Sequence, residues 1–233
     1  MKAVLLAAGT GSRLRPLTDA TPKCLLAFGD RPLLDRWLDA LHRAGAGEVL
    51  VNLHHRADDV IRHLEGRDGP PPVRTSVEPV LLGSAGTLLA NRRWLEHEEM
   101  FVVCNSDNLT DFDLRSIVDL HRRELPAASL AVFRADDPSS CGVVELDRRG
   151  RVVGFVEKPA RPAGNLANAG IYVFHPSVLA ELTGDLPLDI GHDLLPKLVG
   201  RSVAVEVDGY FRDIGTPESY RRAQLDWLEV DAR

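Results

Sequence analysis

The stretch LLAAGTGSRLRPLTDATPKCLL, residues 5–26, joins an apolar run to a loop rich in glycine and positive charge. Two glycines one residue apart after a strand expose backbone N–H groups that can cradle phosphate oxygens. Arg13 and Lys23 supply positive charge for a phosphate, and Pro16 and Pro22 stiffen the connection. The stretch therefore predicts a strand followed by a phosphate-binding loop.

The loop differs from the two best-known nucleotide fingerprints. GTGSRL begins like the dinucleotide motif G-x-G-x-x-G, but Leu14 occupies the third glycine position, where close helix–strand packing requires glycine. The P-loop pattern GxxxxGK[ST] does not occur in the sequence. A nicotinamide oxidoreductase is therefore a disfavoured hypothesis, and the loop belongs to a different phosphate chemistry.

Composition limits the partners of the protein. The chain has 233 residues, of which 44% are hydrophobic and 27% charged, as in ordinary globular proteins. Its formal net charge of −6 argues against a nucleic-acid partner and against an anionic membrane surface. No run of ~20 apolar residues is present to span a bilayer. We therefore expect small-molecule partners, with local cations binding any anionic ligand.

The cysteines and the N-terminus indicate the compartment. Cys24, Cys104 and Cys141 are widely spaced, without a CxxC pair or a nearby histidine group. Buried free thiols in a reducing compartment are the expected state. The opening MKAVLLAAGTG runs into glycines and charge instead of a cleavage site. We expect a cytoplasmic protein.

Apolar runs of strand length alternate with amphipathic stretches of helical length in the first half. This alternation predicts parallel βαβ units and an α/β, doubly wound sheet. Strands are expected at 2–8, 48–53, 73–78, 100–105 and 128–133, with helices at 32–45, 57–66, 84–95 and 113–124.

The pattern changes after Phe133. We expect two short strands around DRRGR within 142–159, further strands at 169–174 and 203–207, helices near 176–183 and 192–199, and a last helix from Pro217. This second half is interpreted as an elaboration on the same sheet, which becomes mixed but mostly parallel. The whole chain, 1–233, is expected to form one domain.

The opening loop resembles the signature GxGxRLxPLTxxxPKxLL of the sugar-1-phosphate nucleotidylyltransferases (NTP transferases). The resemblance continues in order through EPVLLGSAGTL (78–88), NSDNLTDFDL (105–114), CGVVE (141–145), FVEKP (155–159), NAGIYVF (168–174) and DIGTPESY (213–220). The sequence looks most similar to mannose-1-phosphate guanylyltransferase-like members.

The resemblance implies a Rossmann-like nucleotidyltransferase fold with a sugar-binding β-elaboration in its second half. Residues 1–134 would mainly bind the nucleotide and residues 135–233 the sugar phosphate, without the C-terminal β-helix of many relatives. The implied activity is of the EC 2.7.7 type: a nucleotidyl group passes from an NTP to a sugar 1-phosphate, pyrophosphate leaves, and Mg²⁺ assists. A homodimer is compatible with the sequence. A non-catalytic regulatory relative that binds a nucleotide sugar is the main hypothesis from another class.

The family motifs assign site residues by position. The residues that resemble catalytic ones are Arg13, Lys23, Asp107, Lys158 and Asp213, of which Asp107 and Asp213 would hold Mg²⁺. The nucleotide would be bound by Leu6, Ala7, Ala8, Gly9, Gly11, Arg13, Lys23, Glu78, Gly83 and Ser84. The sugar phosphate would be bound by Gly142, Glu157, Lys158 and Asn168. Asp111 and Asp113 compete with Asp107 for the metal position.

Glu78 bears on which base is transferred. A carboxylate only accepts hydrogen bonds, and guanine offers adjacent N1–H and N2–H₂ donors, whereas uracil and thymine offer one N–H between carbonyls. GTP is therefore the favoured nucleotide, and the resemblance to mannose-1-phosphate guanylyltransferase-like members implies mannose 1-phosphate as the sugar substrate. DIGHDLLP (189–196) and YFRDIG (210–215) are similar to adenylyl-transferring enzymes that act on glucose 1-phosphate. Uridylyl and thymidylyl transfer stay open, and Glu78 could instead pair with Arg74.

Overall fold

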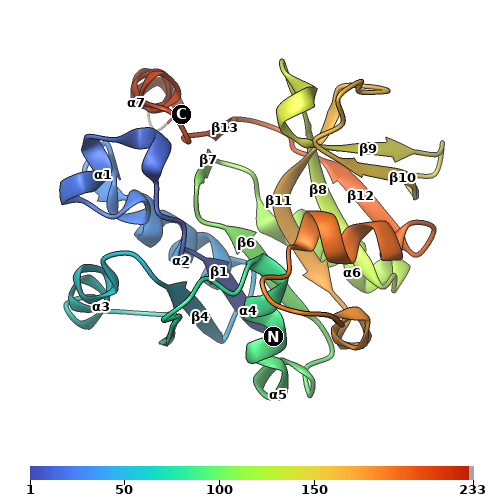
Figure 1. The fold of residues 1–233 in the computed structure, drawn as a ribbon, viewed down its shortest axis with the longest axis horizontal. Helices are drawn as coiled ribbons and strands as arrows, with labels where there is room; N and C mark the ends of the chain where they lie inside the picture. The colour runs from blue at the N-terminus through green and yellow to red at the C-terminus, as the bar shows by residue number, and fades with distance from the viewer. Residues whose placement is uncertain (231–233) are drawn as a thin grey trace. The chain divides into compact units, whose positions relative to one another are not determined.

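The computed structural model describes residues 1–230 and divides them into two compact units that alternate along the chain. The N-terminal unit consists of residues 3–81, 105–113 and 208–230, and the central unit of residues 82–104 and 114–207 together with residues 1–2. Figure 1 labels the elements of both. Segments far apart in the sequence therefore fold together within each unit.

Parallel strands form the centre of the N-terminal unit. They are β1 (Lys2–Leu6), β4 (Glu48–Leu53) and β5 (Val73–Val77), in the order β1-β4-β5. The β4 strand pairs with β5 in a regular parallel register from Val49 to Leu53. Because the strands run in one direction, the residues that follow them share one edge of the sheet, where open α/β sheets bind their ligands.

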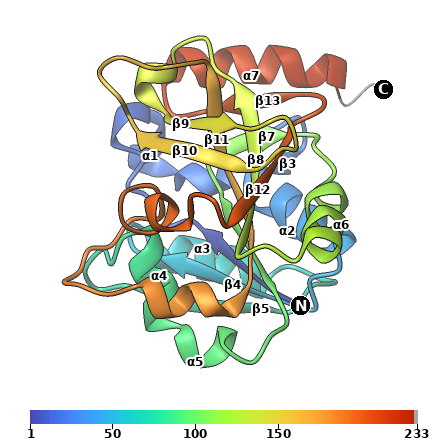
Figure 2. The same cartoon turned by 90° about the vertical axis from the view of Figure 1, so that its right-hand side faces the viewer.

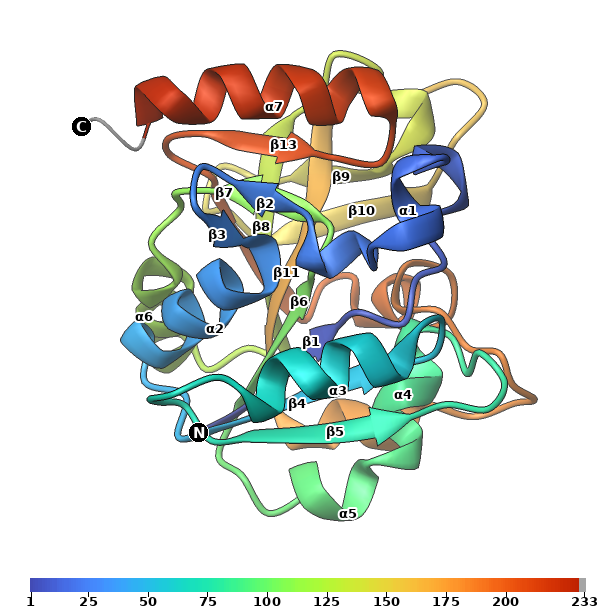
Figure 3. The same ribbon diagram turned by 90° about the vertical axis from the view of Figure 1, so that its left-hand side faces the viewer.

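Two short antiparallel ladders and four helices complete this unit. The ladders pair β2 (Ala27–Phe28) with β3 (Arg31–Pro32) and β7 (Asn108–Thr110) with β13 (Phe211–Asp213). The helices are α1 (Leu17–Ala20), α2 (Leu33–Arg43), α3 (Ala57–Glu65) and α7 (Pro217–Val230). Figure 3 shows α7 lying along β13.

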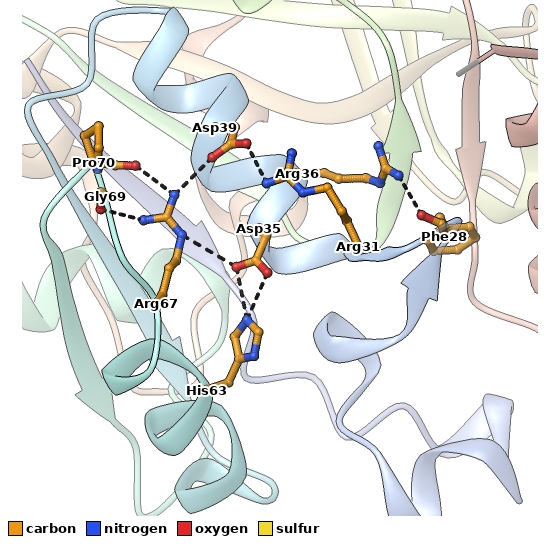
Figure 4. A network of polar contacts seen from close by, with 9 residues as sticks. All are labelled: Phe28, Arg31, Asp35, Arg36, Asp39, His63, Arg67, Gly69 and Pro70. Atoms are coloured by element: carbon orange, nitrogen blue, oxygen red, sulfur yellow. Dashed lines mark hydrogen bonds and ion pairs between the residues drawn. The ribbon is translucent and has the colours of Figure 1, made fainter. Parts of the chain in front are cut away.

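The α2 helix forms as its apolar periodicity predicts. Leu34, Trp37, Leu38 and Leu41 recur on one face and are at most 3% exposed. The opposite face carries charged residues that hold the 66–72 connection in place (Figure 4).

Arg67 is the centre of that polar network. Its guanidinium lies 3.0 Å from Asp39 Oδ1 and 3.6 Å from Asp35 Oδ1, and it donates to the carbonyls of Gly69 (2.9 Å) and Pro70 (2.7 Å). Only 12% of the Arg67 side chain is exposed, so these bonds are partly shielded from water. The proline-rich connection is thereby fixed to α2.

The central unit is mainly antiparallel. Its strands are β6 (Phe101–Asn105), β8 (Ala128–Arg134), β9 (Gly142–Leu146), β10 (Val152–Glu157), β11 (Leu166–Phe174) and β12 (Ser202–Glu206), and its helices are α4 (Ser84–Ala90), α5 (Arg92–Leu95) and α6 (Leu114–Glu124). The order is β10-β9-β11-β6, with β8 antiparallel to β11 and parallel to β12. The predicted hairpin is β9–β10, visible in Figure 2.

The predicted helices of the second half are only partly correct. Residues 176–183 and 192–199 are not α-helical: Pro176–Glu181 and Leu195–Leu198 are short 3₁₀-helices, and Ile190–Leu194 is one turn of π-helix. Pro196 lies inside the predicted helix 192–199 and lacks the N–H that an α-helix would pair with the His192 carbonyl. The helix predicted at 84–95 divides into α4 and α5 at Asn91, whose side chain donates to the Thr87 carbonyl.

The fold class predicted from the sequence is confirmed: the protein is α/β, with parallel strands at its centre and antiparallel strands from its second half. No helix within residues 1–230 combines the length and the apolar character needed to cross a membrane. All three cysteines are free thiols, and Cys24 and Cys104 are buried as predicted, while Cys141 is partly exposed. Burial raises the pKa of the Cys24 thiol to about 12.

Candidate active site

The segment after β1 forms a tight loop in the N-terminal unit. Gly11 has φ +62°, and its carbonyl accepts the Leu14 N–H at 2.9 Å and the Thr18 hydroxyl at 2.8 Å. A Cβ at position 11 would lie 2.8 Å from a Thr18 side-chain carbon, so both conformation and packing require glycine. A Cβ at Gly9 would meet no protein atom within 4 Å. The chain therefore leaves room for a phosphate beside the Gly9 backbone.

Lys23 lies between two carboxylates of the same unit. Its Nζ is 2.9 Å from Asp107 Oδ2 and 4.0 Å from Asp213 Oδ1. Arg13 reaches the same place, because a Cβ built at Gly215 would lie 2.7 Å from Asp213 Oδ1 and 2.9 Å from Arg13 Nη2. Four of the five predicted catalytic residues therefore gather in the N-terminal unit.

The pairing register of one short ladder, β7 with β13, determines the positions of the Asp107 and Asp213 carboxylates. Asp213 ends β13 opposite Asn108 of β7, and the Ile214 N–H donates to the Asp107 carbonyl at 3.1 Å. Thr216 caps the last helix by accepting the Ser219 N–H at 3.1 Å, and Asp213 Oδ1 accepts the Gly215 N–H at 2.5 Å. Backbone pairing thus brings together two acids that are far apart in the sequence.

The electrostatic environment of this cluster acts on Asp213. Burial raises the pKa of Asp213, and the charge of Asp107 raises it further, against the lowering effects of Lys23 and Arg13. Mg²⁺ is held in proteins by one or two carboxylates together with substrate phosphate oxygens and water. Within residues 1–230 no group of three or more His, Cys, Asp or Glu side chains could hold a metal. The pair fits a magnesium ion that shares its coordination with a bound phosphate.

Asn52, near the end of β4, links the ends of three strands. Its Oδ1 accepts the N–H groups of Ala7 (2.7 Å) and Ala8 (3.3 Å), and its Nδ2 donates to Glu78 Oε1 at 2.9 Å. The predicted strand 2–8 ends at Leu6 because the next two N–H groups turn to this side chain. Sequence reasoning missed Asn52, although a polar residue at the end of a buried strand, in EVLVNL, was a usable signal.

Glu157 and Lys158 lie in the central unit, at the end of β10. Burial raises the pKa of Glu157, with Asp189 adding to the rise and Lys158 opposing it. Lys158 Nζ is 3.9 Å from Glu157 Oε1, and the Lys158 side chain is 62% exposed. A Cβ at Gly142 would lie 2.6 Å from Glu157 Oε2, so the glycine lets this carboxylate approach the β9 backbone.

The remaining predicted residues of the central unit have partners inside the protein. Asn168 Nδ2 donates to the Tyr172 hydroxyl at 2.6 Å, and Asn168 Oδ1 accepts the Gly170 N–H at 3.1 Å. The Ser84 hydroxyl donates to Asp189 Oδ2 at 2.8 Å and accepts the Ile190 N–H at 2.7 Å. These bonds give Asn168 and Ser84 a structural task beside their predicted roles.

Tertiary packing requires glycine at position 83. It adopts φ +80°, and a Cβ there would overlap the backbone of Leu188. The N–H groups of Ala85 and Gly86, at the start of α4, donate to the Leu188 carbonyl at 2.9 and 3.1 Å. The glycine therefore allows the 186–190 segment to pack against the start of α4.

Comparison with known proteins defines the class. The profile of the nucleotidyl transferase family matches residues 2–230, and the chain belongs to this family. A mannose-1-phosphate guanylyltransferase catalytic subunit beta of Drosophila pseudoobscura is 35% identical over 94% of this chain. The chain spans 60% of the length of that relative.

Solved structures share the fold. A putative glucose-1-phosphate thymidylyltransferase from Bacillus anthracis, crystallised with sucrose, has a TM-score of 0.84 and 26% identity, covering 97% of this chain and 94% of its own. HddC from Yersinia pseudotuberculosis, complexed with GMP-PN, has a TM-score of 0.80 and 25% identity, covering 97% and 99% of the two chains. The relatives include proteins named for guanylyl and for thymidylyl transfer.

Proposed function

We propose that the protein transfers a nucleotidyl group from an NTP to a sugar 1-phosphate. An oxygen of the sugar phosphate attacks the α-phosphorus of the NTP in line, the bond from that phosphorus to the β-phosphate bridge oxygen breaks, and pyrophosphate leaves. No protein nucleophile is required, so catalysis depends on positioning and charge. The observation that carries the proposal is the convergence of Lys23 on Asp107 and Asp213 beside Arg13.

The triphosphate contacts of this proposal belong to the N-terminal unit. In the N-terminal unit the loop around Gly9 and Gly11 binds the triphosphate, while Arg13 and Lys23 offset the charge that grows on the leaving pyrophosphate. Mg²⁺ held by Asp107 and Asp213 would offset the charge of the phosphates.

In the central unit Lys158 binds the sugar phosphate. Glu157 accepts hydrogen bonds from sugar hydroxyls, and Gly142 and Asn168 complete this set. Burial and the neighbouring acid raise the pKa of Glu157, so a hydroxyl donor bound there would restore hydrogen bonds to a partly desolvated carboxylate.

GTP and mannose 1-phosphate are the proposed substrates. A carboxylate at position 78 would suit the two adjacent donors of guanine, and relatives at 35% identity are named for guanylyl transfer to mannose 1-phosphate. Thymidylyl transfer to glucose 1-phosphate is the second candidate, because the Bacillus anthracis structure is named for that reaction. A homodimer and a cytoplasmic location stay predictions.

A substrate matrix tests the proposal. The protein is incubated with Mg²⁺, each of GTP, ATP, UTP, CTP and dTTP, and each of several sugar 1-phosphates, and pyrophosphate release is measured. We expect the highest kcat/KM with GTP and mannose 1-phosphate. If turnover is fastest with dTTP and glucose 1-phosphate, the proposed substrates are wrong but the proposed reaction type is retained. If no combination releases pyrophosphate, the proposed transfer reaction is overturned. The hypothesis of a regulatory relative that binds a nucleotide sugar is then favoured.

A further inference from the structure

Asn52 occupies a junction that the proposed reaction does not yet explain. It is 4% exposed, and Glu78, to which it donates, is 2% exposed. The Asn52 oxygen accepts two N–H groups from the start of the glycine loop. One buried amide thus contacts both the residue proposed to read the base and the loop proposed to hold the triphosphate.

Only a carboxamide suits this position. The two loop N–H groups require an acceptor, and the Glu78 carboxylate requires a donor, which an amide supplies from opposite atoms. An aspartate would keep the acceptor but place a second carboxylate against Glu78. An alanine would leave the N–H groups of Ala7 and Ala8 without this acceptor, at a cost of ~1–3 kcal/mol for the buried one of Ala8.

The backbone of Glu78 is held independently of Asn52. Its N–H donates to the Leu53 carbonyl at 2.7 Å, continuing the β4–β5 pairing, and its carbonyl lies 2.7 Å from His54 Nδ1. These two backbone bonds do not involve Asn52, so we expect a substitution of Asn52 to act mainly on the Glu78 side chain and on the loop.

We propose that Asn52 is a positioning residue that sets base selectivity by fixing the Glu78 carboxylate while ordering the N–H groups of the loop. This inference rests on the proposed function, in which Glu78 contacts the base and the loop around Gly9 and Gly11 binds the triphosphate. Asn52 itself touches neither the reacting atoms nor the transferred group.

Asn52→Asp separates the two tasks. The aspartate oxygen still accepts from Ala7 and Ala8, so triphosphate binding is retained, but its charge displaces the Glu78 carboxylate. We expect the Kd of the preferred nucleotide, GTP, to rise at least ~10-fold while the Kd of UTP changes less than ~3-fold, because two like charges held in contact at a buried site disfavour each other. Isothermal titration calorimetry with Mg²⁺ measures both, at a temperature where circular dichroism shows each variant folded.

The matched background is Glu78→Gln. A glutamine can turn its amide to donate to an aspartate at position 52, so the polarity of the bond is reversed and the repulsion disappears. We expect Asn52→Asp to change the Kd of GTP less than ~3-fold when it is made in Glu78→Gln.

The following outcomes decide between the inference and the proposed reaction. The inference is supported if Asn52→Asp loses base selectivity in the wild-type background and causes no such loss in the Glu78→Gln background. Equal weakening of GTP and UTP, or no weakening, overturns it. A wild-type protein that binds GTP selectively but releases no pyrophosphate overturns only the proposed reaction, whereas one that binds no nucleotide overturns both.

Discussion

Asp107 and Asp111 show how two identical side chains, four residues apart, acquire different tasks. Asp107 precedes β7 and lies 2.9 Å from Lys23 Nζ. Asp111 follows β7 and accepts the Tyr210 N–H at 2.6 Å, fixing the turn before β13. Both were open as metal ligands from the sequence. The structure engages Asp111 in the ladder and leaves the proposed metal position to Asp107.

Asp107→Asn tests this assignment. The amide keeps the size of the side chain but loses the charge that would hold Mg²⁺, so we expect kcat to fall at least ~10²-fold, as for other charge-stabilising contacts. The melting temperature should stay within about 3 °C of the wild type, because the side chain is 39% exposed and the amide keeps its size.

The control for this variant is Asp111→Asn. Its amide oxygen can still accept from Tyr210, so we expect kcat within ~3-fold of the wild type. If Asp111→Asn abolishes turnover while Asp107→Asn stays active, the two roles have been assigned the wrong way round.

At the scale of the element, the glycine loop combines two kinds of glycine. Gly11 is required by the fold, since it has positive φ and contacts Thr18 closely. Gly9 has open space where its side chain would be. The sequence motif has glycine at both positions. Only the packing shows that the reason for glycine differs between them.

Alanine at each position separates stability from binding. We expect Gly11→Ala to lower the free energy of unfolding by ~1–3 kcal/mol, because the left-handed conformation and the contact with Thr18 both oppose a Cβ. Gly9→Ala should leave that free energy within ~0.5 kcal/mol but raise the KM for the NTP several-fold, since the methyl group enters the proposed phosphate space. Urea unfolding and steady-state kinetics measure the two. Equal behaviour of the variants would contradict the distinction.

The short strands were the elements that sequence could not predict. β7 and β13 have three residues each, too few for periodicity to detect. Their pairing is nevertheless what sets Asp213 opposite Asn108 and brings Ile214 to the Asp107 carbonyl. The longer elements, such as α2 and the β9–β10 hairpin, were predicted because their patterns extend over enough residues.

Stability of the whole molecule should depend on one buried histidine. His121 on α6 is 3% exposed, and its Nδ1 lies 3.0 Å from the Ser129 hydroxyl. Burial, with a smaller effect of His175, lowers the pKa of His121 from 6.5 to about 4. The unfolded chain therefore binds more protons than the folded protein between these pH values.

Because the unfolded chain binds more protons, the free energy of unfolding falls as the pH falls. The stabilising effect of neutral His121 is complete above pH 6.5 and is lost as the pH falls toward 4, by up to about 3 kcal/mol. Urea unfolding at pH 7.5 and at pH 4.5 measures the change. His121→Asn should reduce the loss, whereas His97→Asn, at a side chain that is 83% exposed, should not. An unchanged acid sensitivity in His121→Asn would contradict the assignment.

The sequence alone determined the reaction family and the order of the main elements, because a long motif and extended apolar periodicity are local properties of the chain. It also indicated Arg13, Lys23, Asp107 and Asp213 by motif. Only the tertiary structure decided that these four side chains meet, since that depends on the β7–β13 register. It alone showed that Asn52 joins Glu78 to the loop, because a hydrogen bond between strand ends depends on which strands are neighbours.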